Sequence, residues 1–257
     1  MDLNSIIKNS RAFTNIQLIG IIGSVGRGER VLGSDNLNDV DFVVVADQCD
    51  TSEKLKLEDS LNTSLNTVFS DILYLKTDTF QKIYYRKRVA QSYFDLFNDI
   101  KILFISENLS TSIDNLKIRD RTVTIDSGFS VLLTRYSAKY LDYDNPNYLY
   151  EYQRLKSISA VVDAHLIYTG RYRSGSLESK KTILGLSWLS KIDQSSISKI
   201  HSTYFYVLLK ENRKIALIMI ASALITIIKA LRHGQIKKLR LCGNYILNQI
   251  GHTKCNR

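Results

Sequence analysis

The sequence predicts an α+β protein, in which a small mixed sheet with packed helices precedes a helical bundle. Up to about residue 118, short apolar runs of strand length alternate with segments of helical pattern. From about residue 119 onward, apolar residues recur every three or four positions in almost continuous helix. The sequence has no Pro-rich or Gly-rich linker between these parts. We therefore expect an α/β domain at 1–118 that packs tightly against a helical domain at 119–257.

The first domain is expected to form four strands joined by helices. Apolar runs rich in β-branched and aromatic residues predict strands at 15–22, 40–46, 68–75 and 99–105. Helical patterns predict one helix that Thr51 or Ser52 caps and that ends near residue 66, and another over 79–97. A further short helix is expected at 2–11. This order predicts a mixed sheet with its helices on one side.

The second domain is expected to be a bundle of five or six helices. Pro146 begins one of them, at a position where its missing N–H is harmless. His165 lies on an apolar helix face, which predicts a core histidine whose ring nitrogens have hydrogen-bond partners. The apolar run 215–228 is shorter than the ~20 residues that cross a bilayer, so we interpret it as a buried helix and expect no membrane partner. The predicted helices are 121–141, 146–169, 177–190, 195–211, 212–233 and 235–250.

The net charge of +10 is distributed unevenly along the chain. Residues 1–129 contain 15 Lys and Arg against 18 Asp and Glu, whereas residues 130–257 contain 20 against 7. An acidic half beside a basic half suits a site for cations and phosphates, although solvated helix faces also account for many basic residues. Three cysteines without metal-ligand spacing, and no recognisable signal peptide, predict free thiols and a cytoplasmic location.

Two apolar runs near the amino terminus enclose a polar loop, which is where the sequence points most clearly to chemistry. Gly23 and Ser24 end the first run, where backbone N–H groups and a hydroxyl can approach phosphate oxygens closely. Arg27 adds a permanent positive charge to the same loop. Asp39 and Asp41 begin the second run, and their spacing of two places both carboxylates on one face of a strand. Two acids beside buried-type residues are unfavourable without cations, which predicts a divalent-metal site.

The ordered set Gly23-Ser24, Arg27-Gly28 and Asp39-Val40-Asp41, with a strand on each side, resembles a known signature. It is that of the polymerase-beta-type nucleotidyltransferases, especially the small bacterial members that carry a helical C-terminal domain. Fourteen residues separate Ser24 from Asp39, slightly more than the family usually has. The extra residues fit an insertion at Asn36 to Asn38, which leaves the chemistry unchanged.

The resemblance implies a two-metal site with a third carboxylate on a neighbouring strand. Asp71, at the start of the third predicted strand, is our candidate, and the alternative is that it only caps a turn. Asp78 is a rival that fits a helix N-cap better. Two Mg²⁺ ions would then be held by Asp39, Asp41 and Asp71. The triphosphate of the donor would be bound by Gly23, Ser24, Arg27, Arg154 and Lys180. For the three basic residues, the alternative is a solvated position on the protein surface.

The implied reaction transfers a nucleoside monophosphate from an NTP to an acceptor hydroxyl and releases pyrophosphate. We expect ATP as the donor on prevalence alone. The acceptor stays open between RNA such as tRNA, a protein, as for a toxin, and a small molecule such as an antibiotic. RNA is slightly favoured by the basic second half. The alternative from a different class is a non-catalytic nucleotide- or nucleic-acid-binding module of the same fold, although such modules usually lose the acids first.

Overall fold

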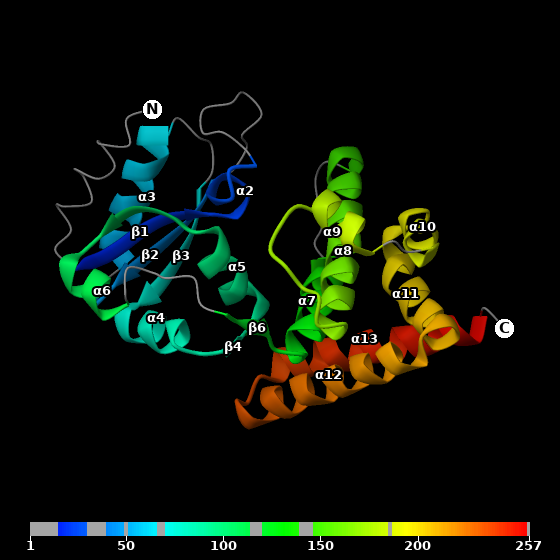
Figure 1. The fold of residues 1–257 in the computed structure, drawn as a ribbon. Coiled ribbons are helices and arrows are strands. Elements are labelled where there is room, and N and C mark those ends of the chain that lie inside the picture. The colour runs from blue at the N-terminus through cyan, green and yellow to red at the C-terminus, as the bar shows by residue number, and fades with distance from the viewer. Residues whose placement is uncertain are drawn as a thin grey trace. The chain divides into compact units, whose positions relative to one another are not determined.

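The computed structural model describes residues 15–29, 40–48, 51–65, 70–113, 120–138, 146–184 and 187–255. Within the chain, contacts cluster into two compact units, Met1–Thr122 and Val123–Arg257 (Figure 1). The first unit contains a mixed sheet and the second is helical, so the predicted α+β class is confirmed. The predicted domain boundary, after residue 118, lies outside the described residues and stays a prediction.

The sheet of the first unit has four strands in the order β3-β2-β1-β5. Strand β1 pairs antiparallel with both β2 and β5, whereas β2 and β3 are parallel. The central strands β1 and β2 are apolar along almost their whole length, which is typical of strands buried on both faces. All four strands were expected, and the described part of the third begins two residues later than predicted. Their bounds are β1 Ile16–Ile22, β2 Val40–Ala46, β3 Ser70–Lys76 and β5 Lys101–Ile105.

Helices cover both faces of this sheet, and the prediction of helices on one side is wrong. Helix α3 (Thr51–Leu65) packs Leu57 and Leu61 against one face. On the other face lie α4 (Thr77–Tyr84), α5 (Gln91–Asp99) and α6 (Glu107–Ser112). Side chains alternate between the two faces of a strand, and in β1 and β2 the side chains on both faces are apolar. Helices must therefore cover each face of the sheet to keep these side chains from water.

The helix predicted over 79–97 is in fact two helices, α4 and α5, separated by a short strand. This strand, β4 (Arg88–Val89), pairs with β6 (Thr122–Val123), and the Thr122 N–H donates to the Lys87 carbonyl at 2.9 Å. The partner strand lies more than thirty residues away in sequence. A tertiary hydrogen bond therefore overrides the local helical pattern.

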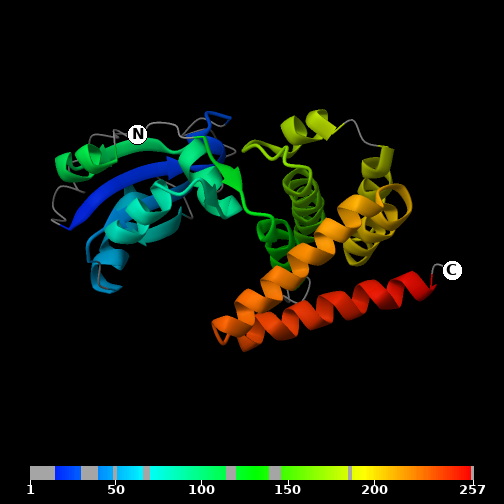
Figure 2. The same ribbon diagram turned by 60° about the horizontal axis from the view of Figure 1, so that its bottom comes forward.

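The second unit contains seven described helices. Helix α8 begins at Pro146 as predicted, whereas the helix predicted over 177–190 is divided into α9 and α10. The helices are α7 (Asp126–Ala138), α8 (Pro146–Tyr168), α9 (Leu177–Leu184), α10 (Ser187–Asp193), α11 (Ile197–Glu211), α12 (Arg213–Arg232) and α13 (Ile236–Cys255). Helices α12 and α13 run side by side, as Figures 1 and 2 show.

Helix α12 is buried along one face only, which corrects the expectation of a buried helix. Ile215, Met219 and Ala223 lie in the interior, whereas Leu217 and Leu224 are 66% and 55% exposed. Among the described residues, α12 is the one helix long and apolar enough to cross a membrane by length and composition. The apolar run of 14 residues considered above is the middle of this 20-residue helix.

His165 is a core residue, as the sequence predicts. Its ring is 5% exposed, its Nδ1 atom lies 3.0 Å from the Tyr204 hydroxyl, and its centroid lies 4.8 Å from the ring of Trp188. Burial, with a smaller contribution from the charge of Arg171, lowers the pKa of His165 to about 4. The folded protein therefore holds this imidazole in its neutral form at neutral pH.

The buried imidazole predicts an acid-sensitive fold. Because the pKa of His165 is lower in the folded than in the unfolded chain, stability should be full above about pH 6.5 and decrease as pH falls toward 4. The decrease attributable to His165 should approach about 3 kcal/mol. Urea unfolding of wild type and His165→Asn from pH 7.5 to 4.5 measures it, and the variant should have the shallower slope. Equal slopes would contradict the prediction.

Candidate active site

Three strands meet in one row at the end of the sheet where the polar loop begins. Ile22, the last residue of β1, pairs with Asp41 near the start of β2. Asp41 in turn pairs in register with Asp71 near the start of the parallel strand β3. Register partners on adjacent strands lie about 5 Å apart in the backbone. The sheet therefore brings the loop after β1 and two of the predicted acids to one edge.

Asp41 lies on the sheet face predicted for it. Val40, Phe42 and Val44 belong to the core under α3. Val43 and Val45 belong to the core on the opposite face, beneath α4 and α5. Since side chains alternate along a strand, Asp41 continues the row of Val43 and Val45 at its solvent end. Its side chain is half-buried, while both cores behind it are apolar.

The carboxylate of Asp41 lies directly against Gly23. This glycine has φ = 68°, and a Cβ atom built on it would be 2.5 Å from Asp41 Oδ2. A side chain at position 23 would thus occupy the space that the carboxylate fills, and it would also have a disfavoured backbone conformation. Gly23 opens the single helical turn α2 (Gly23–Gly26), and the N–H of Arg27, the residue after this turn, donates to the Gly23 carbonyl at 3.0 Å.

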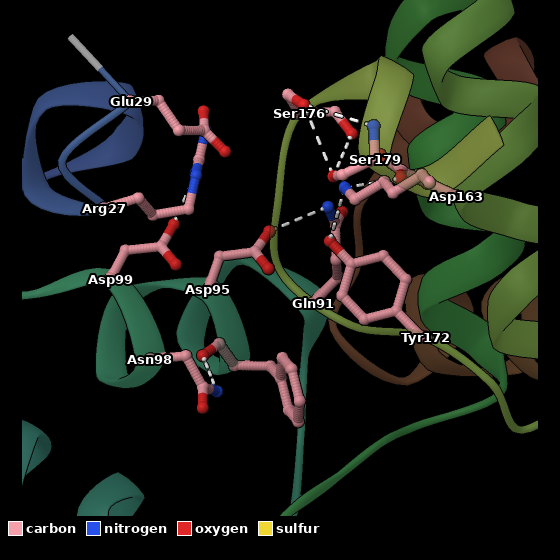
Figure 3. Close-up of polar contacts among 12 residues, drawn as sticks. Arg27, Glu29, Gln91, Asp95, Asn98, Asp99, Asp163, Tyr172, Ser176 and Ser179 are labelled. Carbon is pink, nitrogen blue, oxygen red and sulfur yellow. Dashed lines mark hydrogen bonds and ion pairs between the residues drawn. The ribbon is translucent and has the colours of Figure 1, made fainter. Parts of the chain in front are cut away.

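Arg27 ties the loop to the end of α5. One guanidinium nitrogen donates to Asp99 Oδ2 at 2.6 Å, and the other donates to Glu29 Oε2 at 2.8 Å (Figure 3). Asp99 is 3% exposed and ends α5. Partial burial acts to lower the pKa of Arg27, but the hydrogen bonds and charges of Glu29 and Asp99 outweigh it and raise that pKa above its usual value. The guanidinium is therefore a permanent cation with a fixed position.

Sequence reasoning missed Asp99, the buried partner of Arg27. Asp99 is 72 positions from Arg27 in the sequence. The polar residues around Asp99, just before a strand, do not indicate an ion pair with Arg27. Glu29 is exposed, and its carboxylate accepts a second hydrogen bond from Arg27. The alternation of charges in Arg27-Gly28-Glu29 is a signal that could have suggested the second contact.

The two basic residues predicted from the helical half have carboxylate partners within the second unit. Lys180 is 5% exposed, and its Nζ atom donates to Asp163 Oδ1 at 2.7 Å and lies 4.9 Å from the ring centre of Tyr172. Figure 3 shows Asp163 and Tyr172 of this cluster. Arg154 bonds Glu151 at 2.9 Å and the carbonyl of Asp193 at 2.7 Å. The assignment of Arg154 and Lys180 to a nucleotide stays a prediction.

The predicted three-carboxylate metal site is described only in part. Asp39 lies outside the described residues, and Asp71 is placed by its backbone. Among the residues with described positions, no group of three His, Cys, Asp or Glu could hold a metal ion. What is present suits a hard cation, because the half-buried Asp41 side chain carries carboxylate oxygens. Ser24 follows Gly23 in the same turn.

Gly23 and Gly28 offer a matched test of the contact with Asp41. Both have positive φ, at 68° and 74°, but a Cβ atom at Gly28 would meet no atom within 4 Å. Each Ala substitution should lose about 1–2 kcal/mol of unfolding free energy to backbone strain. Gly23→Ala should lose more, because its methyl group also displaces the Asp41 carboxylate. Chemical denaturation measures both, and equal losses would mean that the contact is not close.

The ion pair between Arg27 and Asp99 should contribute to stability because one member is buried. Asp99→Asn should lower the unfolding free energy by about 1–3 kcal/mol, the range for hydrogen bonds between charged groups. Glu29→Gln, at a more exposed partner of the same guanidinium, should change it by less than about 0.5 kcal/mol. A double-mutant cycle with Arg27→Gln isolates the pair. A coupling energy near zero would refute this role.

Comparison with solved structures finds several proteins that resemble this chain at low sequence identity. Spectinomycin adenyltransferase AAD(9) from Enterococcus faecialis is 10% identical with a TM-score of 0.37, over 86% of this chain and 96% of that one. A nucleotidyltransferase-like protein from Exiguobacterium sibiricum is 12% identical with a TM-score of 0.33, over 86% and 74%. A toxin-antitoxin structure with AMP-PNP is 19% identical with a TM-score of 0.31, over 45% and 84%. No protein-family model and no curated protein matches the sequence. Likenesses of this size are weak, and the function proposed below rests on the residues of the chain itself.

Proposed function

We propose that this protein is a Mg²⁺-dependent nucleotidyltransferase that transfers AMP from ATP to an acceptor hydroxyl and releases pyrophosphate. The observation that supports it is the position of the Asp41 carboxylate against Gly23, at the junction of β1 and β2. The glycine turn that we assign to the phosphates and the carboxylate that we assign to a cation are thus in direct contact. Nucleotidyl transfer needs both at one place, because the cation and the phosphates are bound to each other.

The carboxylates of Asp39, Asp41 and Asp71 are the proposed ligands of two Mg²⁺ ions. Asp41 and Asp71 are register partners on parallel strands, and Asp39 precedes Asp41 by two residues. Oxygen ligands of this type are the ones that Mg²⁺ prefers. When bound, the ions neutralise phosphate charge and make the acceptor hydroxyl easier to deprotonate. Asp71 is the residue we assign to the ion nearest that hydroxyl.

The turn after β1 is the proposed cradle for the β- and γ-phosphates. Gly23 keeps the backbone open at the point of contact with Asp41, and the Ser24 hydroxyl follows it. Arg27, held by Asp99, adds a fixed positive charge in the same loop. A cation whose position is fixed before the reaction loses little entropy when charge develops on the phosphates. Arg154 and Lys180 are proposed as further ligands of the triphosphate, to which Lys180 would bind by exchanging Asp163 for a phosphate oxygen.

The acceptor is proposed to contain a hydroxyl and to bind beside the basic helical unit. Its residues 130–257 carry 20 Lys and Arg against 7 Asp and Glu. An RNA acceptor fits this charge, and a protein or an antibiotic-like molecule are the other candidates. Incubation of the protein with each α-labelled NTP and a cell lysate would identify donor and acceptor class together. Label in no fraction would favour the non-catalytic binding module.

Replacement of the central carboxylate should abolish transfer without unfolding the protein. Asp41→Asn keeps the shape of the side chain but removes its charge, so transfer of label from α-labelled ATP should fall at least about 100-fold. The matched control is Asp47→Asn, because Asp47 lies just beyond the other end of β2, exposed and bonded to Gln17. It should retain near-normal turnover. Thermal melting of both variants would establish that the fold is intact.

The same pair of variants tests the metal by a measurement that needs no acceptor. ATP should raise the melting temperature of wild type and Asp47→Asn more with Mg²⁺ than without it, because ligands of the folded state stabilise it. Asp41→Asn should lose the Mg²⁺-dependent part. If Asp41→Asn transferred label normally, or ATP stabilised all three proteins equally without Mg²⁺, the proposed function would be wrong.

A further inference from the structure

The exposed face of α12 carries a continuous apolar stripe, which we call the α12 stripe. Its five members are 43–66% exposed, far more than is usual for large apolar side chains gathered on one face. They are Leu217, Ile220, Leu224, Ile228 and Leu231. The opposite face of the helix supplies the core of the second unit, and the stripe is its less buried face. Its apolar character therefore needs a separate explanation.

The spacing of the stripe is that of a helix–helix seam. Leu217, Leu224 and Leu231 are seven residues apart, and Ile220 and Ile228 lie between them at steps of three and four. Apolar residues in this repeat form the contact line of two helices that pack along each other. Helix α12 has 20 residues, which corresponds to about 30 Å of such a line.

A groove beside the α12 stripe has room for the side chains of a binding partner. It has a volume of about 230 Å³ and lies between α12, α11, α13 and α7. Two members of the stripe form one wall, and the lining includes Ile220, Leu224, Phe129, Phe205, Tyr245 and Ile246. A helix with protruding apolar side chains fits a groove of this kind.

The charges around the α12 stripe indicate what kind of molecule would bind there. After residue 211 the sequence contains nine Lys and Arg and no Asp or Glu. Arg213 and Lys214 precede the stripe, Arg232 follows it, and α13 begins with further basic residues. Lys229, near the end of the stripe, forms an ion pair with Asp126 at 2.7 Å. A second copy of the chain would bring basic residues against basic residues in either orientation. Acidic flanks on the occupant would instead be attracted.

We propose that the α12 stripe and its groove are the docking site for an acidic amphipathic helix of a partner protein. The partner's apolar residues would lie along Leu217, Leu224 and Leu231 and insert beside Ile220. Its Asp and Glu residues would face the Lys and Arg at both ends of α12. This inference does not depend on the proposed catalytic activity, because the stripe belongs to the helical unit and uses none of the catalytic residues.

The test uses the full chain and three synthetic 21-residue peptides as probes. The first has Leu at heptad positions with Glu at the flanking positions, the second has Lys in place of Glu, and the third has Ser in place of Leu. Fluorescence anisotropy should give binding of the first peptide at least about tenfold tighter than of either other peptide. Binding should weaken with salt, because the flanking charges are exposed. Equal binding of the acidic and basic peptides, or no binding of the acidic one, would overturn the proposal.

A charged substitution in the stripe and a matched one elsewhere locate the binding surface. Leu224→Glu should weaken binding of the acidic peptide at least about tenfold. The control is Leu55→Glu on α3, since Leu55 is 57% exposed and Leu224 is 55% exposed. It should leave binding unchanged. Both variants should melt within a few degrees of wild type, because each position is exposed.

The other occupants of the stripe give distinct results that would each overturn the proposal. If the first unit of the same chain covered the stripe, Leu224→Glu would lower the melting temperature strongly while Leu55→Glu would not. If a second copy covered it, sedimentation equilibrium would show a dimer that Leu224→Glu dissociates. If a membrane were the occupant, vesicles of phosphatidylserine and phosphatidylcholine would bind wild type and lose binding on Leu224→Glu.

Discussion

The candidate active site depends on the antiparallel pairing of β1 with β2. Its register places Ile22 opposite Asp41, so the turn after one strand meets the acid at the start of the other. A shift of one residue would exchange the two faces of β2 and move Asp41 into the core that now holds Phe42. Burial of an unneutralised carboxylate opposes that shift. In the pairing of β2 with β3, Asp41 lies opposite Asp71.

The features that could be predicted from the sequence are those that short-range patterns determine. The bounds of β2 are as predicted, because a run of apolar residues is bounded by polar ones and both of its faces are buried. Helix α8 begins at Pro146 because proline is favoured in the first turn of a helix. The face of Asp41 followed from alternation alone. The seven-residue spacing of the α12 stripe was also present in the sequence, but a stripe of this kind does not reveal whether it is buried.

The features that could not be predicted depend on partners far along the chain. Nothing near Arg27 indicates Asp99, because the contact arises only when α5 packs beside the end of β1. Helical periodicity continues through 79–97, yet the chain extends at Arg88 to pair with β6. The second sheet face needed helices because β1 and β2 are apolar on both sides. Local propensity is a weak guide wherever such tertiary pairing competes with it.

The buried pair of Lys180 and Asp163 constrains how the helical unit can change over time. Both side chains are almost fully removed from water, and their charges neutralise each other at 2.7 Å. Replacing either one alone would leave a charge inside the protein without the opposite charge that now compensates it, a change that typically loses several kcal/mol. Replacing both with apolar residues of similar volume can be neutral. The pair can therefore be lost without a large cost in stability only if both residues change, so we expect positions 163 and 180, on α8 and α9, to be substituted together.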